Sequence, residues 1–359
     1  MDPAANNFAL LRLAAAASVV VSHSFLLATG DPLAQPLAGM TRYNLGQHAV
    51  NVFFVLSGIM VAGSLDRSAT IARFALARAL RILPGLAVCI LVTALVFGSF
   101  VTVHPWADYV SDLRTYIYVE QTLVFGKVSA HLPGVFETNP LPLSVNEPLW
   151  TLKYEVLCYA GLALMAVGGA WRSERAFRIV LGLSLLVCVL VTITKLGPNG
   201  ATITDNVARF WLCFGIGLCF YRYRARLVLS WPVLSAIGIL WWFGRATSLE
   251  PALTFVLAGY GAVMLAALPV GGLRHWANRT DLSYGVYIYG WPVSQILVWA
   301  MPGIAGAMLA GFSLALAALL GFLSWTWVER PSLGARAFFV AWLDNLVSKR
   351  SVAVGSPES

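Results

Sequence analysis

The sequence predicts an all-α polytopic integral membrane protein with about ten transmembrane helices. Two features of the composition lead to this fold class: 59% of the 359 residues are hydrophobic and only 11% are charged. A soluble domain carries roughly 25% charged residues, so the composition excludes an ordinary soluble enzyme. The third observation is a series of long apolar stretches, which we expect to form helices that enclose a channel.

Ten apolar stretches have about the length that a helix needs to cross a bilayer, roughly 17–25 residues. They are 8–28, 48–65, 82–103, 149–170, 178–195, 206–221, 228–244, 250–269, 282–300 and 303–328. The first resembles a cleaved signal peptide in length, but its start, MDPAANNFALLR, lacks a strongly basic region, and polar residues interrupt its apolar run. We therefore expect it to remain in the mature chain.

The stretches between the spans predict the orientation of the chain. Cytoplasmic loops retain Lys and Arg. Seven of the 24 basic residues fall on one side of the predicted membrane, and the others fall on the opposite side; the seven are Arg42, Arg114, Lys127, Lys153, Lys195, Arg209 and Arg245. Both termini are therefore predicted to lie in the cytoplasm. The formal charge of +8 fits this retention and contact with anionic lipid, and no basic motif with interleaved aromatic residues suggests a nucleic acid partner.

One transmembrane domain is expected over residues 1–331, followed by a cytoplasmic tail at 332–359. The connection at about 104–148 is long and rich in proline, and it is expected to form an outer loop. All five cysteines fall within the predicted spans, in no metal-binding spacing. The sequence therefore predicts neither a disulfide framework nor a metal site.

The first span carries two ionisable residues, Arg12 and His23, within its apolar run. They are about three helical turns apart, so both project from nearly the same face and lie roughly 16 Å apart along the axis. Ionisable groups at membrane depth usually face a protein interior or a water-filled cavity. The pair indicates a functional site, although Arg12 is also consistent with contact to lipid phosphate, and His23 with a neutral ring bonded to a neighbouring helix.

The outer ends of two other spans hold polar groups near the depth of His23. Asn51 enters with the second span, and Glu155 lies about 9 Å inside the fourth. A carboxylate beside an imidazole orients its tautomer and holds its pKa near neutrality, as a general base requires. We therefore expect His23 to act as a base beside Glu155; an ion pair of Glu155 with Lys153 or Arg209 is the alternative.

A basic segment, RFALARALRILPG, precedes the third span. Its Arg78 and Arg81 are three residues apart and therefore neighbours on one helical face, which suits forked contacts with phosphate. Retention of positive charge in the cytoplasm explains the same residues equally well. Together with Arg12, the segment predicts a phosphate site at the inner end, a base at the outer end, and a channel between them.

Several short motifs, in this order, resemble the membrane acyltransferase 3 family, whose members O-acylate cell-surface and extracellular glycans. The pattern of Arg, ten residues and His matches Arg12 and His23, and Arg-x-x-Arg followed by proline matches residues 78–84. The other matching blocks are FFVLSG at 53–58, LWTLKYE at 149–155, SYGVYIYGWPV at 283–293 and VERP at 328–331. The resemblance therefore extends over nearly the whole chain.

The resemblance implies a membrane O-acyltransferase. It would move an acyl group, acetyl by the family's habit, from cytoplasmic acyl-CoA to a hydroxyl of an extracytoplasmic carbohydrate such as exopolysaccharide, O-antigen or lipo-oligosaccharide. The implied setting is the bacterial inner membrane, and no metal is implied. The implied catalytic residues are His23 and Glu155, the residues for the CoA phosphates are Arg12, Arg78 and Arg81, and those for the acceptor or the oxyanion are Asn51, Trp150 and Ser57.

Two residues depart from the family pattern, because many members carry Asp at the position of Asn51 and His at the position of Gly290. Direct transfer and a covalent acyl-histidine intermediate are both compatible with the motifs. A transporter or flippase of a glycan or small solute is the alternative function, since a polytopic bundle with intramembrane charges also describes that class. A membrane sensor that binds a ligand without turnover is a third.

Overall fold

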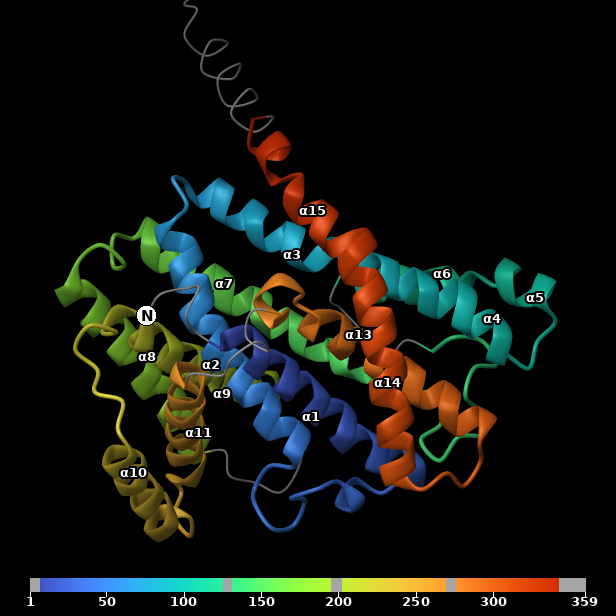
Figure 1. Cartoon of the computed structure of the whole chain (residues 1–359), viewed down its shortest axis with the longest axis horizontal. Coiled ribbons are helices and arrows are strands. Elements are labelled where there is room, and N and C mark those ends of the chain that lie inside the picture. Colours follow the sequence, from blue (N-terminus) through green and yellow to red (C-terminus); the bar gives the residue numbers. More distant parts are fainter. Residues whose placement is uncertain (1–6, 125–130, 195–201, 269–275, 342–359) are drawn as a thin grey trace, which may run out of the picture.

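The computed structural model describes residues 7–124, 131–194, 202–268 and 276–341, and the regular structure in these ranges is helical (Figure 1). The predicted all-α class is therefore confirmed. The longer helices are α1 (Phe8–Thr29), α2 (Leu45–Asp66), α3 (Ile71–Leu91), α7 (Leu152–Val167), α8 (Glu174–Thr194), α9 (Ile203–Arg222), α10 (Trp231–Gly244), α11 (Glu250–Ala267), α13 (Ser283–Ala300) and α14 (Gly306–Ser324).

Each predicted span overlaps one of these helices. The third, predicted at 82–103, begins earlier than expected, because its helix starts at Ile71 and continues through η3 (Val92–Phe97) to Val101. Seven helical stretches in the described ranges are long and apolar enough to cross a membrane: Phe8–Thr29, Leu45–Asp66, Ile71–Val101, Glu174–Thr194, Ile203–Arg222, Glu250–Ala267 and Gly306–Ala341. The other three predicted spans correspond to α7, α10 and α13, which have 16, 14 and 18 residues. The protein is accordingly a multi-pass membrane protein.

Two long helices pass through π-helical segments instead of ending where the α-helix does. The π-helix η3 (Val92–Phe97) and the short α4 (Gly98–Val101) continue α3. In the same way, η5 (Trp325–Glu329) and α15 (Arg330–Gly334) continue α14. Single turns of π-helix shift the register of the side chains that follow and are often found at functional sites; here η5 carries a buried carboxylate, Glu329.

The predicted outer loop contains short helices of its own. They are α5 (Trp106–Ser111), α6 (Leu113–Leu123) and the 3₁₀ turn η4 (Glu147–Thr151). The hydroxyl of Tyr109 donates to the carbonyl of Ala94 at 2.6 Å, and Tyr118 is fully buried. The segment therefore packs against the η3 end of the third span, at the right of the bundle in Figure 1.

The start of α2 is fixed by a reciprocal capping box. The side chain of Asn44 accepts from the backbone N–H of Gln47 at 2.8 Å, and the side chain of Gln47 accepts from the N–H of Asn44 at 3.0 Å. Two of the helix's first N–H groups are thus satisfied locally. This cap sets where the polar residues of α2 lie along the bundle.

Helices α1, α2 and α13 form the centre of the bundle, and α10 and α11 lie to one side of it (Figure 1). Helix α1 packs against α2, α13 and α14, and α2 packs closely against α9. The contact between α2 and α9 depends on two glycines, Gly58 and Gly217. A Cβ atom on Gly58 would lie 2.2 Å from the carbonyl oxygen of Phe214, and one on Gly217 would lie 2.1 Å from that of Val55.

We predict that Gly58→Ala separates α2 from α9 and destabilises the protein. Alanine is ordinarily favoured over glycine within a helix, but here the added methyl group meets backbone, and such overpacking costs about 1–3 kcal/mol. Thermal unfolding of purified protein in detergent measures the effect. Gly311→Ala in α14 is the matched control, since nothing lies within 4 Å of its added Cβ; equal melting temperatures for the two variants would contradict the packing described here.

Candidate functional site

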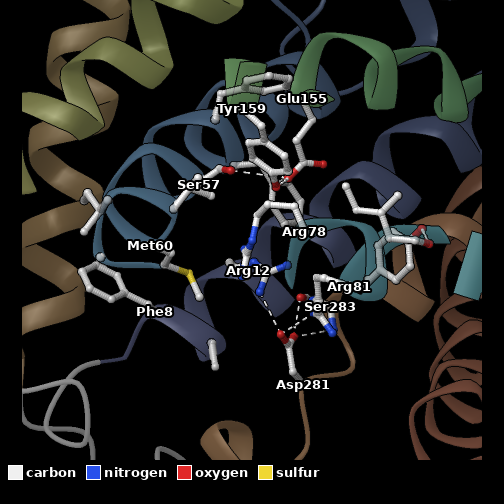
Figure 2. A pocket seen from close by; sticks show the side chains of 18 of the residues that line it. Phe8, Arg12, Ser57, Met60, Arg78, Arg81, Glu155, Tyr159, Asp281 and Ser283 are labelled. Carbon is white, nitrogen blue, oxygen red and sulfur yellow. Dashed lines mark hydrogen bonds and ion pairs between the residues drawn. The ribbon is translucent and has the colours of Figure 1, made fainter. Parts of the chain in front are cut away.

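A cavity of about 700 Å³ lies inside the bundle (Figure 2). It is lined from α1, α2, α3, α7 and α13, with further residues from the end of α9, from η5 and from α15. Charged and aromatic side chains share its walls with apolar ones. The polar and aromatic lining residues include Arg12, Phe53, Ser57, Arg67, Arg78, Arg81, Glu155, Tyr159, Tyr221, Arg224, Asp281, Tyr284 and Tyr287.

Asp281 joins two arginines at one wall of this cavity. Its Oδ2 accepts from Arg12 Nη1 at 2.8 Å and from Arg81 Nη2 at 2.5 Å (Figure 2). Its Oδ1 accepts from the hydroxyl of Ser283 at 2.5 Å and from the Ser283 N–H at 3.2 Å. Each carboxylate oxygen therefore accepts two hydrogen bonds, and the group connects α1, α3 and the start of α13.

The ionisation of Asp281 is a consequence of this pairing. Burial raises the pKa of the carboxyl, but the charges of Arg12 and Arg81 and the bonds from Ser283 outweigh burial and hold the pKa well below 3.8, its ordinary value. A group with a lowered folded-state pKa contributes stability that is fully present above its unfolded pKa. That contribution is lost only as the pH falls from there through the lowered value, so the network is intact at neutral pH.

A second carboxylate, Glu329, holds the other side of Arg81. Its Oε2 accepts from Arg81 Nη1 at 3.0 Å, and its Oε1 accepts from the hydroxyl of Ser324 at 3.0 Å. The Arg81 guanidinium also lies 5.7 Å from the ring centres of both Tyr284 and Trp325. Two acids and two rings thus fix Arg81, and both of its terminal nitrogens are already bonded to carboxylates, so it cannot make a bidentate contact with a phosphate.

Glu155 lies on the opposite wall with two hydroxyl donors. Tyr159, one helical turn further along α7, donates a hydrogen bond to Oε1, and Ser57 of α2 donates to the same oxygen at 3.4 Å (Figure 2). The alternative ion pairs for Glu155 are not formed in the described structure. Lys153 lies over the ring of Tyr154 at 5.1 Å, and Arg209 bonds elsewhere.

Arg78 is the inner arginine that holds no carboxylate. Its guanidinium lies 6.0 Å from the ring centre of Tyr159, and it forms no ion pair within the described ranges. Its Nε is buried and has no hydrogen-bond partner. A guanidinium that lines a cavity without a carboxylate partner is available to an anionic ligand. No group of three or more His, Cys, Asp or Glu in the described residues is arranged for a metal.

His23 is placed outside this cavity. Its ring meets Trp291 edge to face, with centroids 4.8 Å apart, and its nitrogens form no hydrogen bond to any described residue. On α2 the cavity wall ends at Val50. One turn further out, Gly46 lies level with Ser22, the neighbour of His23, because a Cβ on Gly46 would lie 3.1 Å from Ser22 Cβ. His23 therefore lies about 6 Å, or one helical turn, beyond the end of the cavity.

Asn51 and Trp150 also lie outside the cavity wall. Asn51 is buried, and its Oδ1 accepts from Arg209 Nε at 2.7 Å, while its Nδ2 has no partner. Arg209 also donates to the Gln47 carbonyl at 2.9 Å and lies 4.5 Å from the ring centre of Tyr43, but it forms no ion pair within the described ranges. Trp150 packs on Phe210 with ring centroids 5.7 Å apart.

We predict that Asn51→Asp stabilises the protein. The substitution keeps an oxygen 2.7 Å from Arg209, gives this buried guanidinium a carboxylate, and removes a buried N–H group without a partner, each of which is favourable by about 1 kcal/mol or more. Asn51→Leu, which removes the bond, is expected to destabilise by a similar amount. Thermal melts of both variants measure this, and a lower melting temperature for Asn51→Asp would refute the assignment of the pair.

The structure thus brings five of the predicted site residues together and leaves three apart. Arg12, Ser57, Arg78, Arg81 and Glu155 line one cavity, whereas His23, Asn51 and Trp150 do not. Sequence reasoning missed Asp281, Glu329 and Tyr159. Signals for them exist: Glu329 is an acid in the VERP motif at the end of an apolar stretch, and Tyr159 follows Glu155 by one helical turn.

A family profile described as an acyltransferase domain matches residues 6–328. The chain belongs to the membrane acyltransferase 3 family. It is therefore an acyltransferase, and the family and the enzyme class predicted from its motifs are confirmed. The match covers every residue of the acyltransferase's cavity except Leu333, at the end of α15.

Two curated relatives of this acyltransferase match over most of its length. An O-acetyl transferase of Shigella phage Sf6 is 28% identical over 340 residues, which are 91% of this chain and 96% of the relative. Nodulation protein 10 of Rhizobium leguminosarum bv. viciae is 28% identical over 370 residues, which are 94% of this chain and 95% of the relative. No solved structure matches the chain.

Proposed function

We propose that this acyltransferase moves an acetyl group from cytoplasmic acyl-CoA to a hydroxyl of a carbohydrate on the far side of the bacterial inner membrane. The observation that carries the proposal is the single cavity that joins Arg12, Arg78 and Arg81 to the Glu155 cluster. The name of the phage relative, O-acetyl transferase, supports acetyl as the acyl group. Exopolysaccharide, O-antigen and lipo-oligosaccharide are the classes of acceptor that fit.

The proposed orientation is supported by the basic loops, because cytoplasmic retention of Lys and Arg predicts that both termini and the Arg12 end of the cavity lie in the cytoplasm. In this orientation the donor enters from the Arg12 end, and the acceptor approaches the His23 end. Arg78 makes the direct charge contact with the donor, since Arg12 and Arg81 are held by Asp281 and Glu329. These two arginines shape the wall against which the phosphates pass.

In the transfer step His23 removes the proton from the acceptor hydroxyl, and the oxygen attacks the thioester carbonyl. The carbon–sulfur bond then breaks, CoA leaves as the thiolate, and the proton on His23 returns to the sulfur. Reaching His23 requires the cavity to extend by about one helical turn. Glu155 supplies negative charge on the cavity side, and Asn51 and Trp150, beyond the cavity wall, are the proposed contacts for the acceptor or the oxyanion. Transfer through an acyl-histidine would use the same residues.

We predict that purified protein transfers label from radiolabelled acetyl-CoA to a candidate glycan, and that His23→Ala lowers the rate by about a hundredfold or more while leaving the fold intact. Loss of a general base commonly has an effect of this size. His104→Ala is the matched control, because His104 is exposed and distant from the cavity wall. Full activity of His23→Ala would remove the histidine from the mechanism. Movement of an unlabelled glycan across vesicles would favour a transporter.

A further inference from the structure

A second pair of arginines lines the cavity at the end farthest from His23. Arg67 follows the last residue of α2, and Arg224 follows the end of α9 by two residues. On α2 the lining runs from Val50 to Arg67, which spans about 25 Å at 1.5 Å per residue. Both arginines are exposed, so they form the mouth of the cavity.

The two guanidinium groups of the mouth lie beside one aromatic ring. The position of a Cβ on Gly63 is 3.2 Å from Arg67 Nη1 and 3.1 Å from Tyr221 Cε2, so Arg67 lies next to the edge of this ring. Arg224 lies 4.3 Å from the centre of the same ring, and its Nη1 donates to the Tyr221 carbonyl at 2.8 Å. Because Gly63 has no side chain, the Arg67 guanidinium and the Tyr221 ring can both lie close to α2 at this position.

The charge balance differs between the mouth and the inner part of the cavity. The inner arginines face three carboxylates, those of Glu155, Asp281 and Glu329. At the mouth, neither Arg67 nor Arg224 forms an ion pair within the described ranges. Asp66, which precedes Arg67, accepts from Trp171 Nε1 at 2.7 Å and from the Tyr221 hydroxyl at 2.8 Å, so it pairs with neither arginine. The positive charge available to a ligand is therefore concentrated at the mouth.

The wall between these two regions is mostly apolar. From Ser57 to Arg67 the distance along α2 is about 15 Å, and Ile59, Met60 and Phe220 line this part. A matching ligand is elongated, with phosphate esters at its outer end and an uncharged arm that reaches inward. This pattern fits a nucleotide joined to a thioester by a long arm.

We infer that Arg67 and Arg224 form a distinct subsite that holds the ribose phosphate at the nucleotide end of the donor. The inference rests on the proposed function, because it takes acyl-CoA as the donor. It assigns the outermost phosphate to the mouth and leaves the diphosphate of the same molecule, between the ribose and the uncharged arm, to Arg78. Forked, charge-assisted hydrogen bonds from arginine to phosphate are among the stronger polar contacts in proteins.

The test compares CoA with dephospho-CoA, which lacks the ribose phosphate, by calorimetric titration of the full chain in nanodiscs of neutral lipid. The wild type is expected to bind CoA more tightly, and Arg67→Gln with Arg224→Gln is expected to lose roughly tenfold or more in affinity for CoA and little for dephospho-CoA. The loss should be larger at low salt. Arg226→Gln is the matched control: it lies in the same loop, outside the cavity wall, paired with exposed Glu174.

Two results would overturn the inference while leaving the proposed function in place. One is equal affinity of the wild type for the two nucleotides, and the other is unchanged CoA affinity in the double variant. A further measurement compares melting temperatures in nanodiscs of neutral and of anionic lipid. If anionic lipid raises the melting temperature of the wild type but not that of the double variant, and the double variant still binds CoA, the arginines bind lipid headgroups instead. Absence of any CoA binding by the wild type would instead reject acyl-CoA as the donor.

Discussion

The carboxylate of Asp281, shared by two guanidinium groups, is the interaction on which the rest of the site depends. It joins Arg12 and Arg81, which lie 269 and 200 residues away in the sequence. Unpaired charges at membrane depth are costly, and removing one partner of a buried pair leaves the other uncompensated. The pairing therefore constrains how α1 and α3 lie beside the start of α13, and with them the inner wall of the cavity.

The same pairing decides which charges remain for a ligand. Asp281 and Glu329 each hold one terminal nitrogen of Arg81, and Asp281 also holds one terminal nitrogen of Arg12. Arg78, which lies one helical turn from Arg81, has no such partner and faces the cavity. An arrangement of this kind keeps the wall rigid before a ligand arrives, so that little ordering is needed on binding.

The sequence predicted the helices better than their facing partners. Apolar length predicted a helix at each of the ten stretches, and seven of these helices, within the described ranges, are long and apolar enough to cross a membrane. Such helices depend on local patterns in the sequence. The partners of Glu155 depend instead on how α7 rotates against α2, which no local pattern encodes. The periodicity of α1 places Arg12 and His23 on nearly one face, yet only Arg12 meets the cavity. Gly290 of α13 lets that helix come close to α1 at Val20, on the His23 side of Arg12.

A double-mutant cycle on Arg12 and Asp281 measures whether their ion pair holds α1 to the start of α13. The free energies of unfolding of Arg12→Gln, Asp281→Asn and the double variant would be measured in one detergent at neutral pH. We predict strong coupling, about 1–3 kcal/mol, because each single change leaves a mostly buried charged group without its partner. Additive effects of the two changes would show that the Asp281 carboxylate does not hold these helices together.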